Sequence, residues 1–212
     1  MLWKFVDKVG AYKGPLIHAA YPHTSRGDAV LTLVAGILFR DRPILLAQAS
    51  EFVGIQGRLL RLAGGFPVEI RGGGGVGTVD NVLKWMARTP HKSLALSPEG
   101  WIAATPRWRT GYYVWSMATG FPVTYCWVDY SRRILTREHP VELSGDPARD
   151  LALASQLLKP GVALYPDRAS PIRFKAGWTL DWERLERQRE LWRRSQSVSK
   201  PQADTRSDVA KC

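Results

Sequence analysis

The chain has 212 residues, of which 45% are hydrophobic, 10% aromatic and 23% charged; this composition excludes an intrinsically disordered chain and fits one globular domain with a single core. The 30 lysines and arginines outnumber the 19 acidic residues, and the formal charge of +11 favours anionic partners such as phosphates, nucleic acid or acidic lipid headgroups. The two cysteines are too few for a disulfide framework or a cysteine-based zinc site, which indicates a reducing, cytoplasmic compartment.

The first half of the sequence alternates short apolar runs with helical patterns. A weakly amphipathic segment at 2–11 comes first. Further along, Thr24 or Ser25 is a suitable N-cap for a largely apolar, buried helix that runs to Phe39. The remaining elements are expected as strands at 16–20, 43–47, 66–70 and 93–96, and as helices at 57–62 and 78–88.

The second half continues this alternation as far as residue 165. The expected elements are helices at 111–119 and 148–158 and strands at 123–130, 133–141 and 162–165. Together they predict an α/β fold, a single layered domain over 1–195 with a central mixed sheet flanked by helices. Residues 196–212 have no core-forming pattern and are expected to be a disordered tail. No apolar run reaches the ~20 residues of a spanning helix, and the N-terminus lacks the apolar region of a secretory signal.

Near the C-terminus, an amphipathic helix is expected at 175–194. Four apolar residues recur on one face at helical spacing, while arginines occupy the rest: Trp178, Trp182, Leu185 and Trp192. Two interpretations are open. The stripe packs onto the core of the domain, or it lies on a membrane surface with tryptophans at headgroup depth and arginines on anionic phosphates.

The segment with the clearest chemistry is a turn in which four residues separate His23 from Asp28. Asp28 is expected in the first turn of a helix, where the helix N-terminus stabilises its negative charge. From there it can accept a hydrogen bond from one imidazole nitrogen of His23, which leaves the other nitrogen to remove a proton from a hydroxyl. This is two thirds of a Ser-His-Asp triad, and the substrate would bring its own nucleophile.

The same residues admit other interpretations. A His and an Asp at this spacing also occur by chance, and His18 and His23 with Asp28 are possible metal ligands. His18, however, lies inside an apolar strand, where a buried structural histidine is the ordinary case. We therefore predict no metal site.

Three further motifs follow the turn in order: residues 64–71 (GGFPVEIR), 96–100 (LSPEG) leading to 107–113 (RWRTGYY), and 120–123 (GFPV). With the turn, these four blocks over residues 16–130 resemble the lysophospholipid acyltransferase family, the 1-acyl-glycerol-3-phosphate acyltransferase-like enzymes with a His-x4-Asp motif. The resemblance implies a glycerolipid acyltransferase-like fold with a membrane-facing tunnel. It also implies transfer of a fatty acyl group from acyl-CoA or acyl-carrier protein to a lipid hydroxyl.

The resemblance also assigns roles to residues. His23 matches the general base of the family and Asp28 the carboxylate that orients it. Glu99 and Gly100 match the Pro-Glu-Gly block that lines the site, and we expect backbone N–H groups of this turn to stabilise the oxyanion. No metal or bound cofactor is implied, because the acyl thioester is a co-substrate.

Three departures from the family pattern weaken the expected binding of an acceptor phosphate. Trp101-Ile102 replaces a Thr-Arg pair, and Gln48 replaces a lysine. The arginine after Glu69-Ile70 comes one position late, which in a strand turns its side chain to the other face. Four arginines are candidates to compensate in substrate binding: Arg26, Arg71, Arg107 and Arg109. A lysophospholipid, glycolipid or amino-lipid acceptor is therefore favoured over a glycerol phosphate.

Rival motifs are weaker. Residues 72–77 contain Gly-x-Gly-x-x-Gly, but four consecutive glycines satisfy that pattern easily and no acidic residue follows at the dinucleotide-binding position. The nine tryptophans are scattered and match no nucleic-acid-binding module, so no nucleic-acid partner is expected. The sequence thus predicts a peripheral membrane acyltransferase with a thioester donor, a lysolipid acceptor and an anionic membrane surface as partners. The alternative is a catalytically silent basic protein that binds lipid or nucleic acid.

Overall fold

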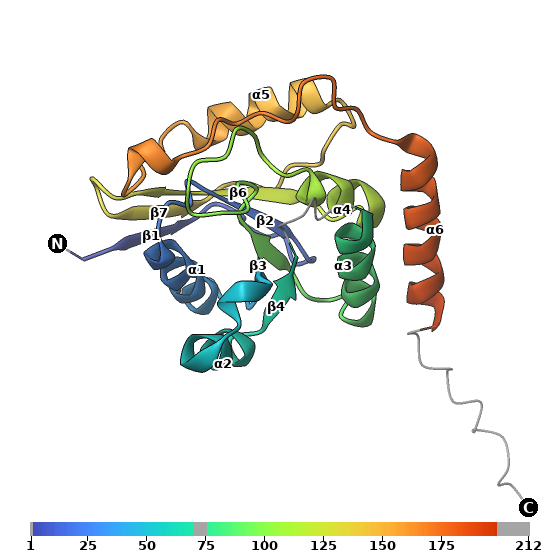
Figure 1. Cartoon of the computed structure of the whole chain (residues 1–212), viewed down its shortest axis with the longest axis horizontal. Coiled ribbons are helices and arrows are strands. Elements are labelled where there is room, and N and C mark those ends of the chain that lie inside the picture. Colours follow the sequence, from blue (N-terminus) through green and yellow to red (C-terminus); the bar gives the residue numbers. More distant parts are fainter. Residues whose placement is uncertain (1, 70–75, 199–212) are drawn as a thin grey trace, which may run out of the picture.

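A computed structural model describes residues 2–69 and 76–198, and these ranges contain one seven-stranded sheet in the order β1-β7-β6-β2-β5-β3-β4 (Figure 1). The β6-β7 pair is antiparallel and the other neighbours are parallel. The strands are β1 (Lys4–Asp7), β2 (Ile17–Tyr21), β3 (Ile44–Gln48), β4 (Gly65–Val68), β5 (Leu94–Leu96), β6 (Val123–Asp129) and β7 (Ile134–Arg137). The predicted α/β fold with a mixed sheet is confirmed.

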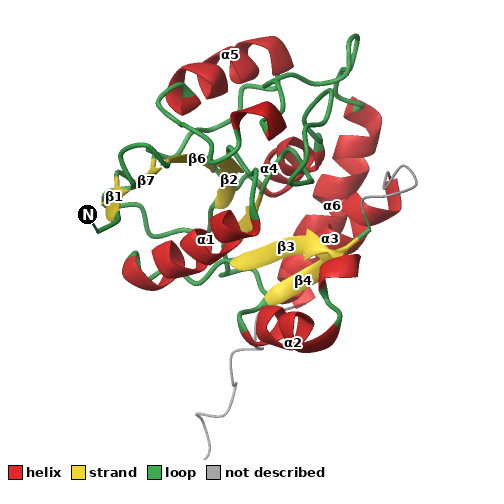
Figure 2. Cartoon of the chain, turned by 60° about the vertical axis from the view of Figure 1, so that its left-hand side comes forward, coloured by secondary structure: helices red, strands yellow, loops and turns green. Residues whose placement is uncertain are grey.

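Six α-helices flank the sheet within the described ranges (Figure 2). They are α1 (Arg26–Leu38), α2 (Gly54–Leu62), α3 (Val76–Arg88), α4 (Gly111–Thr119), α5 (Pro147–Leu158) and α6 (Trp182–Val198), with short 3-10 helices η1 (Ala49–Glu51) and η2 (Pro166–Arg168). None of them is long and apolar enough to span a membrane.

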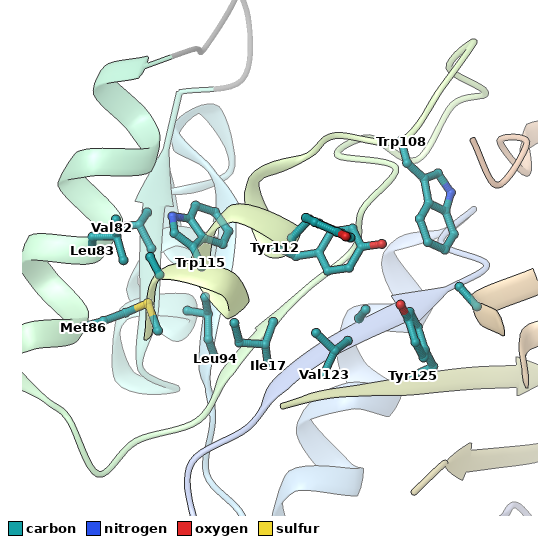
Figure 3. Packing of buried hydrophobic residues seen from close by; sticks show 14 of the residues in the cluster. Ile17, Val82, Leu83, Met86, Leu94, Trp108, Tyr112, Trp115, Val123 and Tyr125 are labelled. Atoms are coloured by element: carbon teal, nitrogen blue, oxygen red, sulfur yellow. The ribbon is translucent and has the colours of Figure 1, made fainter. Parts of the chain in front are cut away.

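One face of the sheet carries the hydrophobic core. Successive side chains of a strand point to opposite faces, and Ile17 of β2 with Val123 and Tyr125 of β6 point to the face covered by α3 and α4 (Figure 3). Val82 of α3 and Tyr112 of α4 belong to the same buried cluster, and all five side chains have no exposed surface. Aromatic and branched side chains thus form the core on this side of the sheet.

The other face is covered by α1 across a cavity. His18 and Ala20 of β2, and Cys126 and Val128 of β6, alternate with the core residues and line this cavity. The prediction of a buried helix here is wrong, because Asp28 and Ala35 are the buried residues of α1. Several of its apolar side chains face outward instead, among them Val30, Val34, Ile37 and Leu38.

Three other boundaries differ from the sequence predictions. The segment at 2–11 supplies the edge strand β1, which pairs with β7. Residues 162–165 form no strand, although Val162 makes a single parallel bridge to Asp129. Helix α6 begins at Trp182 and includes residues 196–198, which were expected in the tail; residues 199–212 lie outside the described part of the chain.

Three of the four residues of the C-terminal tryptophan stripe pack inward, and the fourth, Trp182, is 52% exposed. Trp178, which precedes α6, stacks edge-on against Phe174 at 4.8 Å between ring centroids. Leu185 is 1% exposed, and Trp192 packs against Phe121 at 5.4 Å. The membrane-facing interpretation is therefore wrong for these three residues, because α6 rests on α3 and α4.

Candidate active site

The candidate site lies where β2 ends and α1 begins. Ser25 is the N-cap of α1, and Asp28 sits at its third helical position. The Asp28 carboxylate closes the turn, since its Oδ2 accepts the backbone N–H groups of Thr24 at 2.7 Å and Ser25 at 2.9 Å. Two orphan N–H groups at the start of the helix are thereby satisfied, and this local geometry carries His23 to the carboxyl edge of the sheet.

His23 and Asp28 face each other as the spacing predicts. His23 Nδ1 lies 3.4 Å from Asp28 Oδ2, and the side chains are 24% and 7% exposed, respectively. This separation is slightly longer than the roughly 2.6–3.2 Å of a catalytic hydrogen bond, as is common for such pairs without substrate. The histidine lines the cavity, so the imidazole is oriented by a buried carboxylate and open to a ligand.

Tyr130 supports Asp28 from the end of β6, a contact that the sequence analysis missed. Its hydroxyl donates a hydrogen bond to Asp28 Oδ1, which also accepts the Ser25 hydroxyl at 3.1 Å. Burial by itself raises the pKa of Asp28, but the hydrogen bonds from His23, Tyr130 and Ser25 outweigh it and hold the pKa below its ordinary value. Burial and the Asp28 carboxylate raise the pKa of Tyr130 to about 12, so the phenol stays a donor beside an ionised carboxylate.

Glu99 does not line the cavity, and this corrects its predicted role in substrate binding. Its side chain is completely buried. Oε2 accepts the backbone N–H of His23 at 2.5 Å and Oε1 accepts that of Ser170 at 2.7 Å. Burial raises its pKa, although these hydrogen bonds act against the rise. Glu99 therefore fixes the position of the His23 backbone and ties it to the loop that contains Ser170.

Two N–H groups of the Pro-Glu-Gly turn donate within the turn itself. The backbone N–H of Gly100 donates to the carbonyl of Ser97 at 3.1 Å, and that of Glu99 donates to the Ser97 hydroxyl at 3.3 Å. The expected oxyanion role of this turn stays a prediction. Gly100 does line the cavity as predicted.

Three of the four candidate arginines reach the same cavity, namely Arg26, Arg107 and Arg109. Arg26 lies at the start of α1 and pairs with Glu51 at 3.6 Å. Arg107 and Arg109 are exposed and lie on the loop between β5 and α4. Arg71 lies outside the described residues. The structure thus places positive charge on two different segments of the cavity wall.

The cavity has a volume of about 890 Å³ and extends from the His23–Asp28 pair along the sheet face covered by α1, and it also reaches residues of α3, α4 and α6 such as Val79, Trp115 and Leu185. Ligand pockets are typically about 300–1,000 Å³ and mainly apolar. Trp101 and Ile102 both lie in its wall. Gln48 also lines the cavity, is 6% exposed, and has no hydrogen-bond partner for its Oε1 in the protein, so it offers a neutral polar group.

His18 belongs to a separate buried network on the cavity face. Its Nε2 lies 2.9 Å from Asp41 Oδ2, and Arg137 bridges Asp41 and Asp7, each at 2.7 Å. The possible metal set of His18, His23 and Asp28 is therefore not supported, because His18 pairs with a different carboxylate. Over residues 2–69 and 76–198, no group of three His, Cys, Asp or Glu side chains is placed to hold a metal ion.

Comparison of the chain with protein-family models, with curated proteins and with solved structures finds no match. The functional argument therefore depends on the geometry of this site and on the sequence motifs that accompany it.

Proposed function

We propose that the protein is an O-acyltransferase that moves a fatty acyl group from a thioester, acyl-CoA or acyl-carrier protein, to the hydroxyl of a lysophospholipid-like acceptor. The observation that carries the proposal is the His23–Asp28 pair on the wall of a largely apolar cavity. A histidine oriented by a buried carboxylate is a general base, and an apolar cavity of this size accommodates an acyl chain. The resemblance of the four motifs to lysophospholipid acyltransferases, with their glycerolipid acyltransferase-like fold, agrees with this chemistry.

In the proposed reaction His23 removes the proton from the acceptor hydroxyl. The oxygen attacks the thioester carbonyl and forms a tetrahedral intermediate, which collapses to the ester as the C–S bond breaks. The thiolate leaves with the proton that His23 received, so no acyl-enzyme forms. Asp28 stays ionised and stabilises the imidazolium in the same way as the carboxylate of a serine protease triad.

The surroundings of the pair favour an acceptor without a tightly held glycerol phosphate. Arg26, Arg107 and Arg109 supply positive charge at the cavity wall, but they are exposed side chains. The buried Arg137 also lines the cavity, but it is held by Asp7 and Asp41. Gln48 adds a neutral hydrogen-bonding group. We therefore propose a lysophospholipid, glycolipid or amino-lipid acceptor, met at the surface of a membrane.

The direct test is an acceptor panel. The purified full chain is incubated with radiolabelled acyl-CoA or acyl-carrier protein and with lysophospholipids, a glycolipid, an amino lipid and 1-acyl-glycerol-3-phosphate, each dispersed in detergent. We expect a labelled ester with at least one acceptor and none with the His23→Ala variant. Failure of every donor and acceptor pair would favour the catalytically silent lipid- or nucleic-acid-binding protein, for which the +11 charge is the supporting observation.

A further inference from the structure

Exposed apolar side chains are concentrated on two helices. In the described part of the chain, eight of the fifteen exposed large hydrophobic residues lie on α1 or on α2 and the residue before it. We call this surface the α1–α2 face; its members are Val30, Val34, Ile37, Leu38, Val53, Ile55, Leu59 and Leu62. Exposed apolar residues concentrated on one part of a protein mark an interaction site, whereas single exposed hydrophobic residues are ordinary.

Helix α2 turns its apolar stripe away from the protein. Ile55, Leu59 and Leu62 recur at helical spacing and are 78%, 61% and 85% exposed, respectively. On the inner side, Gly57 packs so closely that a Cβ would lie 2.1 Å from the carbonyl carbon of Phe52. Helix α2 therefore makes its close contact through a glycine, and its apolar side chains Ile55, Leu59 and Leu62 remain exposed and available to a partner.

Every residue between positions 26 and 62 that is both charged and exposed is an arginine. Five arginines lie between residues 26 and 62, and each is exposed: Arg26, Arg40, Arg42, Arg58 and Arg61. The acidic residues of the same segment are engaged elsewhere or shielded. Asp28 is buried beside His23, Asp41 is held by Arg137 and His18, and Glu51 pairs with Arg26. The α1–α2 face thus combines an apolar surface with positive charge.

The cavity of the candidate site reaches the surface at this face. Val30 of α1 and Leu59 of α2 both line it, and they are 59% and 61% exposed. Arg26 lies at the same place, and its side chain is 71% exposed. A molecule that enters between the two helices therefore leaves an apolar, positively charged surface and passes directly into the apolar cavity beside His23.

We propose that the α1–α2 face docks the protein on an anionic lipid bilayer and that a lipid substrate enters the cavity between α1 and α2. A second copy of this chain fits the face less well. A symmetric dimer would bring the same patch against itself, so arginines would face arginines with no exposed acid between them. Anionic headgroups complement these charges, and acyl chains complement the apolar residues.

This surface is not the one that the tryptophan stripe suggested. Figure 1 shows α6 at one end of the molecule and α1 and α2 toward the other. The inward packing of Leu185 and Trp192 leaves α6 with isolated exposed residues such as Leu191, which is 54% exposed. Helix α6 therefore provides matched controls for a test of the α1–α2 face.

The test uses flotation of the full chain with vesicles of phosphatidylcholine, with or without phosphatidylglycerol. Ile55→Ser with Leu62→Ser removes two exposed side chains that do not line the cavity, and we expect binding to anionic vesicles to fall on the order of a hundredfold. Arg58→Gln is expected to weaken it about fivefold, an effect that added salt abolishes. Leu191→Ser and Arg187→Gln on α6 are the matched controls and should leave binding unchanged.

Two results would overturn the proposal. In the first, the α6 variants lose vesicle binding while the α2 variants keep it, which would show docking by another surface. In the second, the wild-type protein does not bind anionic vesicles. A dimer that the Ile55→Ser, Leu62→Ser variant dissociates, without vesicle binding, would assign the face to a second copy and likewise overturn it. The entry of a lipid substrate rests on the proposed function, whereas docking does not. Vesicle binding that needs the α1–α2 face, without acyl transfer to any detergent-dispersed acceptor, would therefore reject the enzyme and keep the docking surface.

Discussion

The two faces of the sheet are built in opposite ways from the same strands. Ile17 and Val123 point to one side, where α3, α4 and α5 leave no free space around them. His18, which follows Ile17, and Cys126, three residues after Val123, point to the other side, where α1 forms part of the wall of a cavity of about 890 Å³ that also reaches residues of α3, α4 and α6. The filled face stabilises the fold, and the open face carries the candidate chemistry. The side chains that line an empty cavity lose packing contacts. We therefore infer that the cavity accommodates a ligand.

The strongest test of this difference between the two faces is to remove the proposed general base, His23, from the face with the cavity. We expect His23→Ala to lower kcat/KM for acyl transfer on the order of a thousandfold, since a general base contributes about 10²–10⁴. Because His23 is a partly exposed turn residue, the variant should still fold, with only the part of its stability that the His23 hydrogen bond to Asp28 contributes lost at neutral pH. His91→Ala, at an exposed position on another loop, is the matched control, and a His23→Ala enzyme with normal turnover would refute the mechanism.

The two faces can also be compared by matched leucine substitutions. Leu158 of α5 lies in the filled core, whereas Leu135 of β7 lines the cavity. Leu158→Ala is expected to cost about 3–5 kcal/mol of unfolding free energy, because it creates a new cavity in close-packed surroundings. Leu135→Ala should cost about 1–2 kcal/mol, since part of its surroundings is already empty. Equal losses in urea titrations would mean that the two faces are packed alike.

The hydrogen bond from Tyr130 to Asp28 provides a second test on the face with the cavity, at the candidate site itself. That bond helps to hold the pKa of Asp28 down, so Tyr130→Phe should raise it. A carboxyl whose pKa is depressed by folding stabilises the fold above its unfolded pKa, and this contribution is lost as the pH falls through the folded pKa. The variant should therefore lose part of its stability at neutral pH, and the loss should shrink in acid, while turnover at the pH optimum drops about threefold to tenfold. Urea titrations at neutral and acid pH measure the effect on stability, and an unchanged difference between the two would contradict this role of Tyr130.

The smallest expected effect concerns Glu99, which lies behind the site. Its pKa is raised by burial, so its contribution is largest below the ordinary value of 4.5 and is lost as the pH rises through the folded value. Glu99→Gln should flatten this pH dependence of stability. The amide has one acceptor oxygen for the two N–H groups of His23 and Ser170, and the mismatch should cost about 1–2 kcal/mol at neutral pH. Urea titrations from acid to neutral pH measure both effects, and an unchanged pH dependence would exclude Glu99 as its source.

Most elements of the fold were predictable from local patterns. Helix α4 has the predicted bounds, and α1, α3 and α5 lie within a few residues of theirs. The edge strand β1 and the single bridge at Val162 were missed or misplaced, because an edge segment is stabilised by its neighbour more than by its own composition. The glycerolipid acyltransferase-like topology and the acyltransfer activity remain proposals.

The sequence alone determined the local part of the site. The N-cap Ser25 lies between His23 and Asp28, which is the third residue of the helix, so these three residues meet within one turn. The tertiary structure decided everything that depends on residues far apart. It brought Tyr130 to Asp28 from another strand and made Glu99 a buried anchor. It also left α1 partly uncovered: a helix that is apolar all round has no polar side to mark the solvent, so only the packing of its neighbours determines which face stays exposed.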